Sequence, residues 1–182
     1  MRELNISLLL LLSTLLISSC IRIVVKGAQS NYHILAPDQL IKIEGENLCG
    51  MEFPKNPSVV LINGQQLKSC LKKYKKALVY IWSPNCKGAF CYSPSFLQNY
   101  CNENEIEFFL VIEYCDKLFL ENRFGLKKPI FGVDTTYYKT DKVSKYLPKF
   151  LFDLTGLKRN ENRLKYFENG VFVKSLVDIN DL

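Results

Sequence analysis

Cysteines are the residues of this chain best suited to chemistry, because a cysteine thiolate attacks disulfides and binds metal ions. The 182-residue sequence contains seven of them. Cys86 and Cys91 form the closest pair, in the segment Cys86-Lys87-Gly88-Ala89-Phe90-Cys91. This spacing indicates either a redox-active pair or a fixed loop bridge.

The backbone between these two cysteines decides whether they can pair. On a regular helix, residues five apart have Cα atoms about 8–9 Å apart, whereas a disulfide needs roughly 4.4–6.8 Å. Cys86 and Cys91 therefore cannot be bridged across a regular helix. They can pair if Lys87-Gly88-Ala89 forms an irregular turn, which Gly88 permits because glycine adopts backbone angles closed to other residues.

Further cysteines leave the disulfide pattern open. The others in the expected mature domain are Cys49, Cys70, Cys101 and Cys115. With Cys86 and Cys91 they make six thiols, which allow 15 pairings among which the sequence does not choose. In an exported domain such cysteines are more often structural bridges than catalytic groups, so a purely structural reading stays open.

The composition argues against several other classes of site. The single histidine, His33, lies in an expected leader segment, and no two cysteines have the two-residue spacing of a zinc knuckle, so no metal site is predicted. No phosphate-binding glycine loop or dinucleotide fingerprint indicates a cofactor. The net charge of +6 comes mainly from a lysine run and does not indicate nucleic-acid binding. A solvated helix face explains that run, with an anionic lipid surface as the alternative; its members are Lys68, Lys72, Lys73, Lys75 and Lys76.

The N-terminal segment has the order of a secretory signal: a charged start, an apolar run and a small-residue exit. Met1–Asn5 is the charged start and Ile6–Ile17 is the leucine-rich run. The exit, Ile17-Ser18-Ser19-Cys20, resembles the bacterial lipobox. That resemblance implies cleavage before Cys20 and diacylation of its sulfur, and two acyl chains anchor a protein stably.

We therefore expect a signal peptide over 1–19, a lipid-attachment cysteine and tether over 20–35, and one domain over 36–182. The mature protein is expected to be exported and membrane-anchored, in the periplasm or cell envelope. The alternative is an uncleaved anchor, because apolar residues continue past Cys20. Arg22 interrupts them, however, and a span needs about 20 apolar residues.

Short apolar strands that alternate with helical stretches predict an α/β domain. The expected strands are Ser58–Ile62, Ala77–Trp82, Ile106–Ile112 and Phe150–Leu154, followed by a hairpin over Arg163–Leu176 that turns at Asn169-Gly170. The expected helices are one capped by Asn63 that continues to Tyr74, one over Gly88–Asn102, one over Asp116–Phe124 and a short turn at Asp141–Tyr146. Lys127–Lys139 is expected to be irregular.

The strand that ends at Trp82 and the residues after it resemble the active-site segment of the thioredoxin family. That family has a tryptophan before its first cysteine and a proline on the next helix, and the spacings from Trp82 to Cys86 and from Cys86 to Pro94 match. Further on, Pro148 before the expected strand Phe150–Leu154 resembles the family's cis-proline. The resemblance implies a thioredoxin-like fold, with a central mixed sheet flanked by helices.

Three features depart from that family's pattern. Its second cysteine stands three residues after the first, where this chain has Ala89. Its buried acid, two residues before the tryptophan, is Tyr80 here, so a carboxylate that shuttles protons for the second thiol is missing. Too few residues follow Leu176 for the family's C-terminal helix, so that helix is expected to be missing.

The resemblance implies a thiol–disulfide oxidoreductase that acts on protein or small thiols. Cys86 is expected to attack as the thiolate, because a helix N-terminus and the neighbouring Lys87 lower its pKa. Cys91 then resolves the mixed disulfide. Trp82 and Pro148 are expected to contact the substrate chain.

Two other functions remain open from the sequence. The main alternative is a non-catalytic thioredoxin-like module, stabilised by disulfides and used for binding. Peroxidase chemistry of the peroxiredoxin type is a minor option. Ser83 suits that family's pattern, but its usual arginine partner is not identifiable.

Overall fold

A computed structural model describes residues 27–43, 45, 48–50, 58–116, 125–158 and 162–182. The strands are β1 (Leu40–Lys42), β2 (Val59–Ile62), β3 (Lys76–Trp82), β4 (Glu107–Ile112), β5 (Ile130–Val133), β6 (Leu164–Glu168) and β7 (Val171–Leu176). The described α-helices are α2 (Gly64–Leu71), α3 (Pro94–Glu103) and α5 (Val143–Thr155). Short 3-10 helices are η1 (Tyr32–Ile34), η2 (Pro37–Gln39), η3 (Leu48–Gly50) and η4 (Ile179–Asp181). The chain is therefore a mixed α/β protein.

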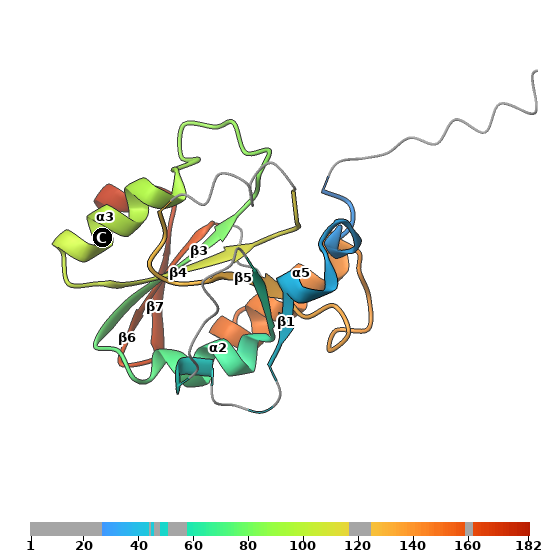
Figure 1. Cartoon of the computed structure of the whole chain (residues 1–182). Helices are drawn as coiled ribbons and strands as arrows, with labels where there is room; N and C mark the ends of the chain where they lie inside the picture. The colour runs from blue at the N-terminus through green and yellow to red at the C-terminus, as the bar shows by residue number, and fades with distance from the viewer. Residues whose placement is uncertain (1–26, 44, 46–47, 51–57, 117–124, 159–161) are drawn as a thin grey trace, which may run out of the picture.

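All seven strands form one mixed sheet, in the order β1-β2-β5-β4-β3-β6-β7 (Figure 1). The first five strands of this order run parallel, whereas β6 is antiparallel to β3 and β7 is antiparallel to β6. The carboxyl ends of the five parallel strands consequently meet at one edge of the sheet. The loop that carries Cys86 and Cys91 begins at this edge, where β3 ends.

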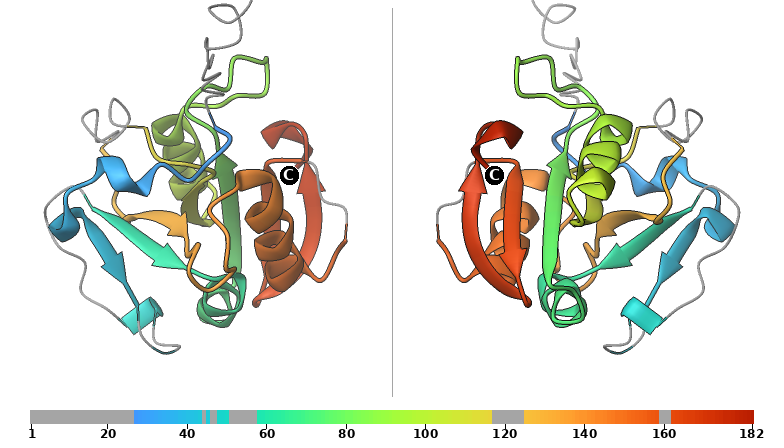
Figure 2. Two further views of the ribbon diagram at one scale, coloured as in Figure 1. Left: turned by 90° about the vertical axis from the view of Figure 1, so that its right-hand side faces the viewer. Right: turned by 90° about the vertical axis from the view of Figure 1, so that its left-hand side faces the viewer.

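Helices cover both faces of the sheet, as Figure 2 shows, with α3 on one side and α2 and α5 on the other. Because neighbouring residues of a strand point to opposite faces, each inner strand supplies two cores. On β3, Leu78 and Tyr80 belong to the core that contains α3, whereas Val79 and Ile81 belong to the core that contains α2 and α5. Burial on both faces explains why β3 and β4 are almost continuously apolar.

Most of the expected strands are confirmed. The runs that begin at Ser58, Ala77 and Ile106 correspond to β2, β3 and β4, and the hairpin of β6 and β7 turns at Asn169-Gly170. The expected cap is also present, because the Asn63 side chain accepts the backbone N–H of Gln66 at the start of α2. These segments share strong local signals: β-branched runs, a capping residue and a two-residue hairpin turn.

Three expectations are wrong. Phe150–Leu154 is not a strand but the last part of α5, and Pro148 lies inside that helix. No cis peptide bond occurs among the described residues, so Pro148 is not the expected cis-proline. Lys127–Lys139, expected to be irregular, contains β5. The short apolar run after Pro148 suits a buried helix as well as a strand, and tertiary packing decides between them.

The helix after the cysteine pair is also shorter than expected. It begins at Pro94 rather than near Gly88, with Ser93 as its N-cap. After β7, the described chain has only the 3-10 helix η4.

Several expectations lie outside the described residues. These are the signal peptide, the lipid-attachment cysteine Cys20, the first part of the tether and most of the expected helix Asp116–Phe124. In the part of the chain that is described, no helix has both the length and the apolar character needed to cross a membrane.

Candidate functional site

The loop between β3 and α3 carries a disulfide that joins Cys86 and Cys91, with their Cα atoms 5.7 Å apart. Two hydrogen-bonded turns shape the loop. The Cys86 N–H donates to the Ser83 carbonyl and the Cys91 N–H donates to the Gly88 carbonyl, both at 3.1 Å. The loop thus has the irregular turn that this pairing requires.

The disulfide lies at the protein surface. Cys86 and Cys91 are both half-buried, and the residues between them are exposed. Phe90, inside the loop, has 47% of its surface exposed, and Trp82 at the base of the loop is half-buried. A thiol of another molecule can therefore reach the bridge.

Tyr114 fixes the first half of this loop to the end of β4. Its buried hydroxyl accepts two hydrogen bonds from Asn85, one from the side-chain amide (2.7 Å) and one from the backbone N–H (3.3 Å). The Ser83 hydroxyl donates to the same oxygen at 3.4 Å. Cys86 therefore follows a segment that is held in place.

Tyr80 fixes the second half of the loop from below. This tyrosine is fully buried in β3, and its hydroxyl donates to the carbonyl oxygen of Tyr92 at 3.1 Å. Burial is the main cause that raises its pKa to about 12, so the phenol remains a hydrogen-bond donor at neutral pH. Tyr80 stands at the position where the thioredoxin family has its buried acid. In this chain the tyrosine instead positions Tyr92, the residue that follows Cys91.

A charged pair lies beside the end of β3. The Arg163 guanidinium is 3.0 Å from the Glu113 carboxylate and donates to the Ile81 carbonyl at 3.2 Å. Burial has the largest effect on the pKa of Tyr80 and raises it. The charge of Arg163 lowers this pKa and the charge of Glu113 raises it, so both charges act on the phenol under the loop. Sequence reasoning missed this pair, because Glu113 and Arg163 come from distant segments that only the pairing of β3 with β4 and β6 brings together.

The expected effect of a helix N-terminus on Cys86 is not supported. Since α3 begins at Pro94, its first turn is separated from Cys86 by most of the loop, and the field of a helix terminus falls off within about one turn. Cys91 receives a different stabilisation. The Gly88 N–H donates to the Cys91 sulfur at 3.1 Å, and such a donor favours a thiolate on that atom after reduction.

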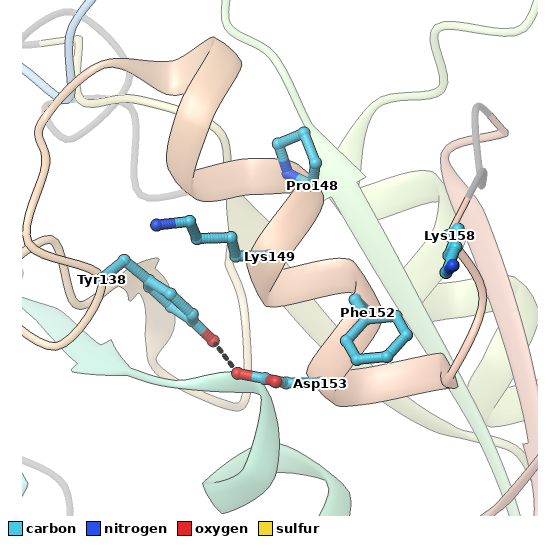
Figure 3. Close-up of a pocket in the computed structure, with 6 residues that line it drawn as sticks. All are labelled: Tyr138, Pro148, Lys149, Phe152, Asp153 and Lys158. Atoms are coloured by element: carbon cyan, nitrogen blue, oxygen red, sulfur yellow. Dashed lines mark hydrogen bonds between the residues drawn. The ribbon is translucent and has the colours of Figure 1, made fainter.

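Pro148, expected to face Cys86 and contact a substrate, is not near the disulfide loop. It lies on α5, whose core residues belong to the opposite face of the sheet from α3. There it lines a separate pocket (Figure 3). Trp82 is the one expected substrate-contact residue that adjoins the loop.

A second disulfide joins Cys49 in η3 to Cys70 in α2, with their Cα atoms 5.2 Å apart. Cys70 is buried in the core between the sheet and α2, and the Cys49 sulfur contacts the Tyr74 hydroxyl. This bridge ties an irregular segment to a helix. Its surroundings are those of a structural disulfide.

The remaining described cysteines, Cys101 and Cys115, are free and buried. Burial is the main cause that raises the pKa of each thiol to about 12. Both are therefore poor nucleophiles in the folded protein. The described residues also contain no group of three or more His, Cys, Asp and Glu side chains that could hold a metal ion.

Comparison of the chain with protein-family models, with curated proteins and with solved structures finds no match of any of the three kinds. The candidate site consequently stands on its own geometry.

Proposed function

We propose that this protein is a thiol–disulfide oxidoreductase of thioredoxin-like fold, with Cys86 and Cys91 as its redox pair. The observation that carries the proposal is the position of their disulfide, half-buried in an exposed loop at the end of an inner strand. Thiol–disulfide exchange requires that a thiolate reach one sulfur of the bridge. The Cys49–Cys70 bridge, with one sulfur in the core, offers poorer access.

The surroundings of the two sulfurs suggest which one is attacked. A substrate thiolate attacks the Cys86 sulfur, the bond between the cysteines breaks, and its electron pair leaves on the Cys91 sulfur. The Gly88 N–H stabilises that departing thiolate. A second substrate thiolate then attacks the substrate sulfur of the mixed disulfide and releases Cys86, so the substrate is oxidised by two electrons and the pair is reduced. Another disulfide compound then reoxidises the pair, and the same steps in reverse reduce a substrate disulfide.

The arrangement of the sheet supports the resemblance to thioredoxin. The strand before the pair, β3, lies between the parallel strand β4 and the antiparallel hairpin of β6 and β7. It ends in Trp82, and α3 follows with Pro94 in its first turn. The helical position of Pro148 and the later start of α3 are departures from the resemblance.

Site-resolved reduction of the two bridges tests the proposal. The oxidised protein is equilibrated with glutathione buffers of increasing reducing power, blocked with iodoacetamide and digested for mass spectrometry. We expect the Cys86–Cys91 bridge to open while Cys49–Cys70 remains intact. In the same buffers, the protein should catalyse oxidation of a reduced dithiol peptide.

Two variants separate catalysis from a structural role. Cys86→Ser should abolish peptide oxidation, whereas reduced Cys91→Ser, incubated with the oxidised peptide, should accumulate a mixed disulfide between Cys86 and the peptide, because the thiol that would resolve it is missing. Cys101→Ser is the matched control, because that buried thiol takes no part in the proposed steps. A Cys86–Cys91 bridge that resists reduction as long as Cys49–Cys70, without peptide turnover, contradicts the proposal.

A resistant bridge without peptide turnover fits the alternative, a non-catalytic binding module of the same fold. The observation that favours this alternative is the distance along the chain between Cys86 and the start of α3, which removes the helix terminus as an activating group. If the parent protein is folded but shows no redox activity, the Cys86–Cys91 bridge is a structural part of a binding module.

We also propose export and lipid attachment at Cys20. Two disulfides suit an oxidising compartment outside the cytoplasm, and the N-terminal residue order suits a lipoprotein signal. In a bacterial host fed a labelled fatty acid, the chain should incorporate the label. Cys20→Ser should abolish incorporation, and Cys101→Ser should leave it unchanged.

A further inference from the structure

A pocket of about 380 Å³ lies on the outer side of α5 (Figure 3). Four of its lining residues come from this helix: Pro148, Lys149, Phe152 and Asp153. Tyr138, from the loop after β5, and Lys158, from the segment after α5, complete it. The volume falls within the usual range of about 300–1,000 Å³ for small-molecule sites.

A chain of hydrogen bonds fixes the floor of this pocket. The backbone N–H of Gly64 donates to the Tyr138 hydroxyl at 2.9 Å, and that hydroxyl donates to the Asp153 carboxylate at 2.8 Å. The Tyr138 ring also packs edge-on against Phe150, with ring centroids 6.5 Å apart. Helices α2 and α5 thus both hold Tyr138, so the floor is formed before any ligand arrives.

The wall of the pocket is largely apolar and partly exposed. Pro148 and Phe152 stand one helical turn apart on α5, and Phe152 keeps 48% of its surface exposed. The Tyr138 ring adds a third apolar surface. A ligand that covered Phe152 would remove this apolar area from water, which is the main source of affinity in such sites.

The charges at the pocket favour an anion. Lys149 and Lys158 are exposed, and in the view of Figure 3 they lie on opposite sides of it. The one acidic group, Asp153, is at the floor and accepts the Tyr138 hydroxyl. The pocket lining therefore carries two exposed cations and one carboxylate, and that carboxylate is already hydrogen-bonded.

From this arrangement we propose that the pocket binds a small organic anion with an aromatic or branched apolar body. The body lies against Phe152 and Pro148, and the anionic group lies at the rim between Lys149 and Lys158. The site is independent of the disulfide loop, because its helix packs on the other face of the sheet from α3. It stands whether or not Cys86 and Cys91 are catalytic.

A matched pair of fluorescent probes tests both parts of the ligand. The first, 8-anilinonaphthalene-1-sulfonate, carries two aromatic groups and a sulfonate; the second, N-phenyl-1-naphthylamine, has the same rings without the charge. Full-length oxidised protein is titrated with each. We expect saturable binding of the anionic probe at one site, several-fold tighter than binding of the neutral probe.

Exposed side chains permit variants that should leave the fold intact. Phe152→Ala should weaken binding of both probes by about tenfold or more. Phe96→Ala is its control, because Phe96 is equally exposed, at 49%, but lies on α3. The double variant Lys149→Gln and Lys158→Gln should weaken the anionic probe several-fold and spare the neutral one. Lys145→Gln, on the same helix but outside the pocket, controls for general charge.

The binding affinities of these variants decide the proposal. Loss of affinity in both pocket variants, with both controls unchanged, supports the site. If Phe152→Ala leaves affinity within twofold of the parent, the pocket is not the binding site. If the double lysine variant binds the anionic probe as tightly as the parent, the ligand is not an anion and the proposal fails.

Discussion

The hydroxyl of Tyr80 donates a 3.1 Å hydrogen bond to the carbonyl oxygen of Tyr92, the residue directly after Cys91. The inner strand β3 therefore holds both ends of the disulfide loop. The loop starts directly after Trp82, the last residue of β3, and Tyr80 of the same strand binds Tyr92 where the loop ends. The two sulfurs are consequently kept near each other by more than their own bond. This contact makes Tyr80 a positioning residue for the proposed redox pair.

Replacing Tyr80 by Phe should loosen the loop with little effect on the core. The variant leaves the Tyr92 carbonyl without its donor, which costs about 1 kcal/mol of stability. In the reduced protein the two thiols should meet less often, so the Cys86–Cys91 bridge should become several-fold easier to reduce. The measurement is the oxidised fraction in glutathione buffers.

Tyr100→Phe is the control for that variant. Tyr100 is half-buried on α3, and its hydroxyl makes no hydrogen bond within the described chain. It should leave the glutathione equilibrium unchanged. An equal shift in both variants means that the Tyr80 hydroxyl has no special role at the loop.

The buried thiols of Cys101 and Cys115 should resist modification in the native state. Because the pKa of each is raised to about 12, the reactive thiolate is scarce at pH 8 and grows only as the pH approaches 12. In urea the pKa returns to roughly 8.5, and modification should be rapid. Iodoacetamide labelling followed by peptide mass spectrometry resolves the two sites. Fast labelling of either residue without denaturant contradicts its burial.

Gly64→Ala should destabilise the fold. A Cβ at this position would lie 2.5 Å from the Phe150 carbonyl oxygen and 2.6 Å from the Asp153 Cβ, so α2 and α5 would have to separate. Overpacking of this kind costs about 1–3 kcal/mol, measured by urea unfolding. Gly88→Ala is the control: its nearest neighbour would be the Cys91 sulfur at 3.6 Å, an ordinary contact, and stability should change by less than about 0.5 kcal/mol.

Lys165 should make stability depend on pH in the neutral to alkaline range. Burial lowers its pKa from 10.5 to about 7 in the folded protein. Between these values the unfolded chain binds more protons than the folded one, so the free energy of unfolding rises with pH. The cost of the charged form is fully present below pH 7 and fades as the pH approaches 10.5.

Urea unfolding at pH 6.5 and pH 9, compared between the parent and Lys165→Met, measures the contribution of Lys165, expected to be a rise of about 2.5 kcal/mol. Lys165→Met removes the titrating group and should flatten this rise. Lys174→Met, on the neighbouring strand, should keep it. Cys101 and Cys115, whose raised pKa values lower the free energy of unfolding above about pH 8.5, act in the opposite direction in every one of these proteins. A change between the two pH values that is the same in the parent and in Lys165→Met refutes the assignment to Lys165.

Strong local signals explain what the sequence predicted correctly. Ser58–Ile62, Ala77–Trp82 and Ile106–Ile112 are apolar runs with β-branched or aromatic residues, and each corresponds to a strand of the sheet. Asn169-Gly170 required only local backbone preference, and both residues have positive φ. In such segments local preference and tertiary packing agree.

The segment around Pro148 shows why other elements were missed. Buried residues recur every fourth position at Tyr146, Phe150 and Leu154, which is a helical pattern that the proline obscured. A proline inside a helix is costly, and packing of α5 against α2 and the sheet outweighs that cost. The same dependence on tertiary context applies to the site, where Tyr114, Glu113 and Arg163 converge on the loop only through the order of the strands.

The pairing between β4 and β5 is the shortest in the sheet and separates β1, β2 and β5 from the other four strands. Strands β4 and β5 pair only at Val111 with Phe131 and at Ile112 with Gly132, whereas β3 and β4 pair along six positions. A sheet that opened at this pairing would leave β1, β2 and β5 on one side and β4, β3, β6 and β7 on the other. In such an opening β3, β4 and the β6–β7 hairpin would stay paired with one another, so the disulfide loop would keep the strands that support it.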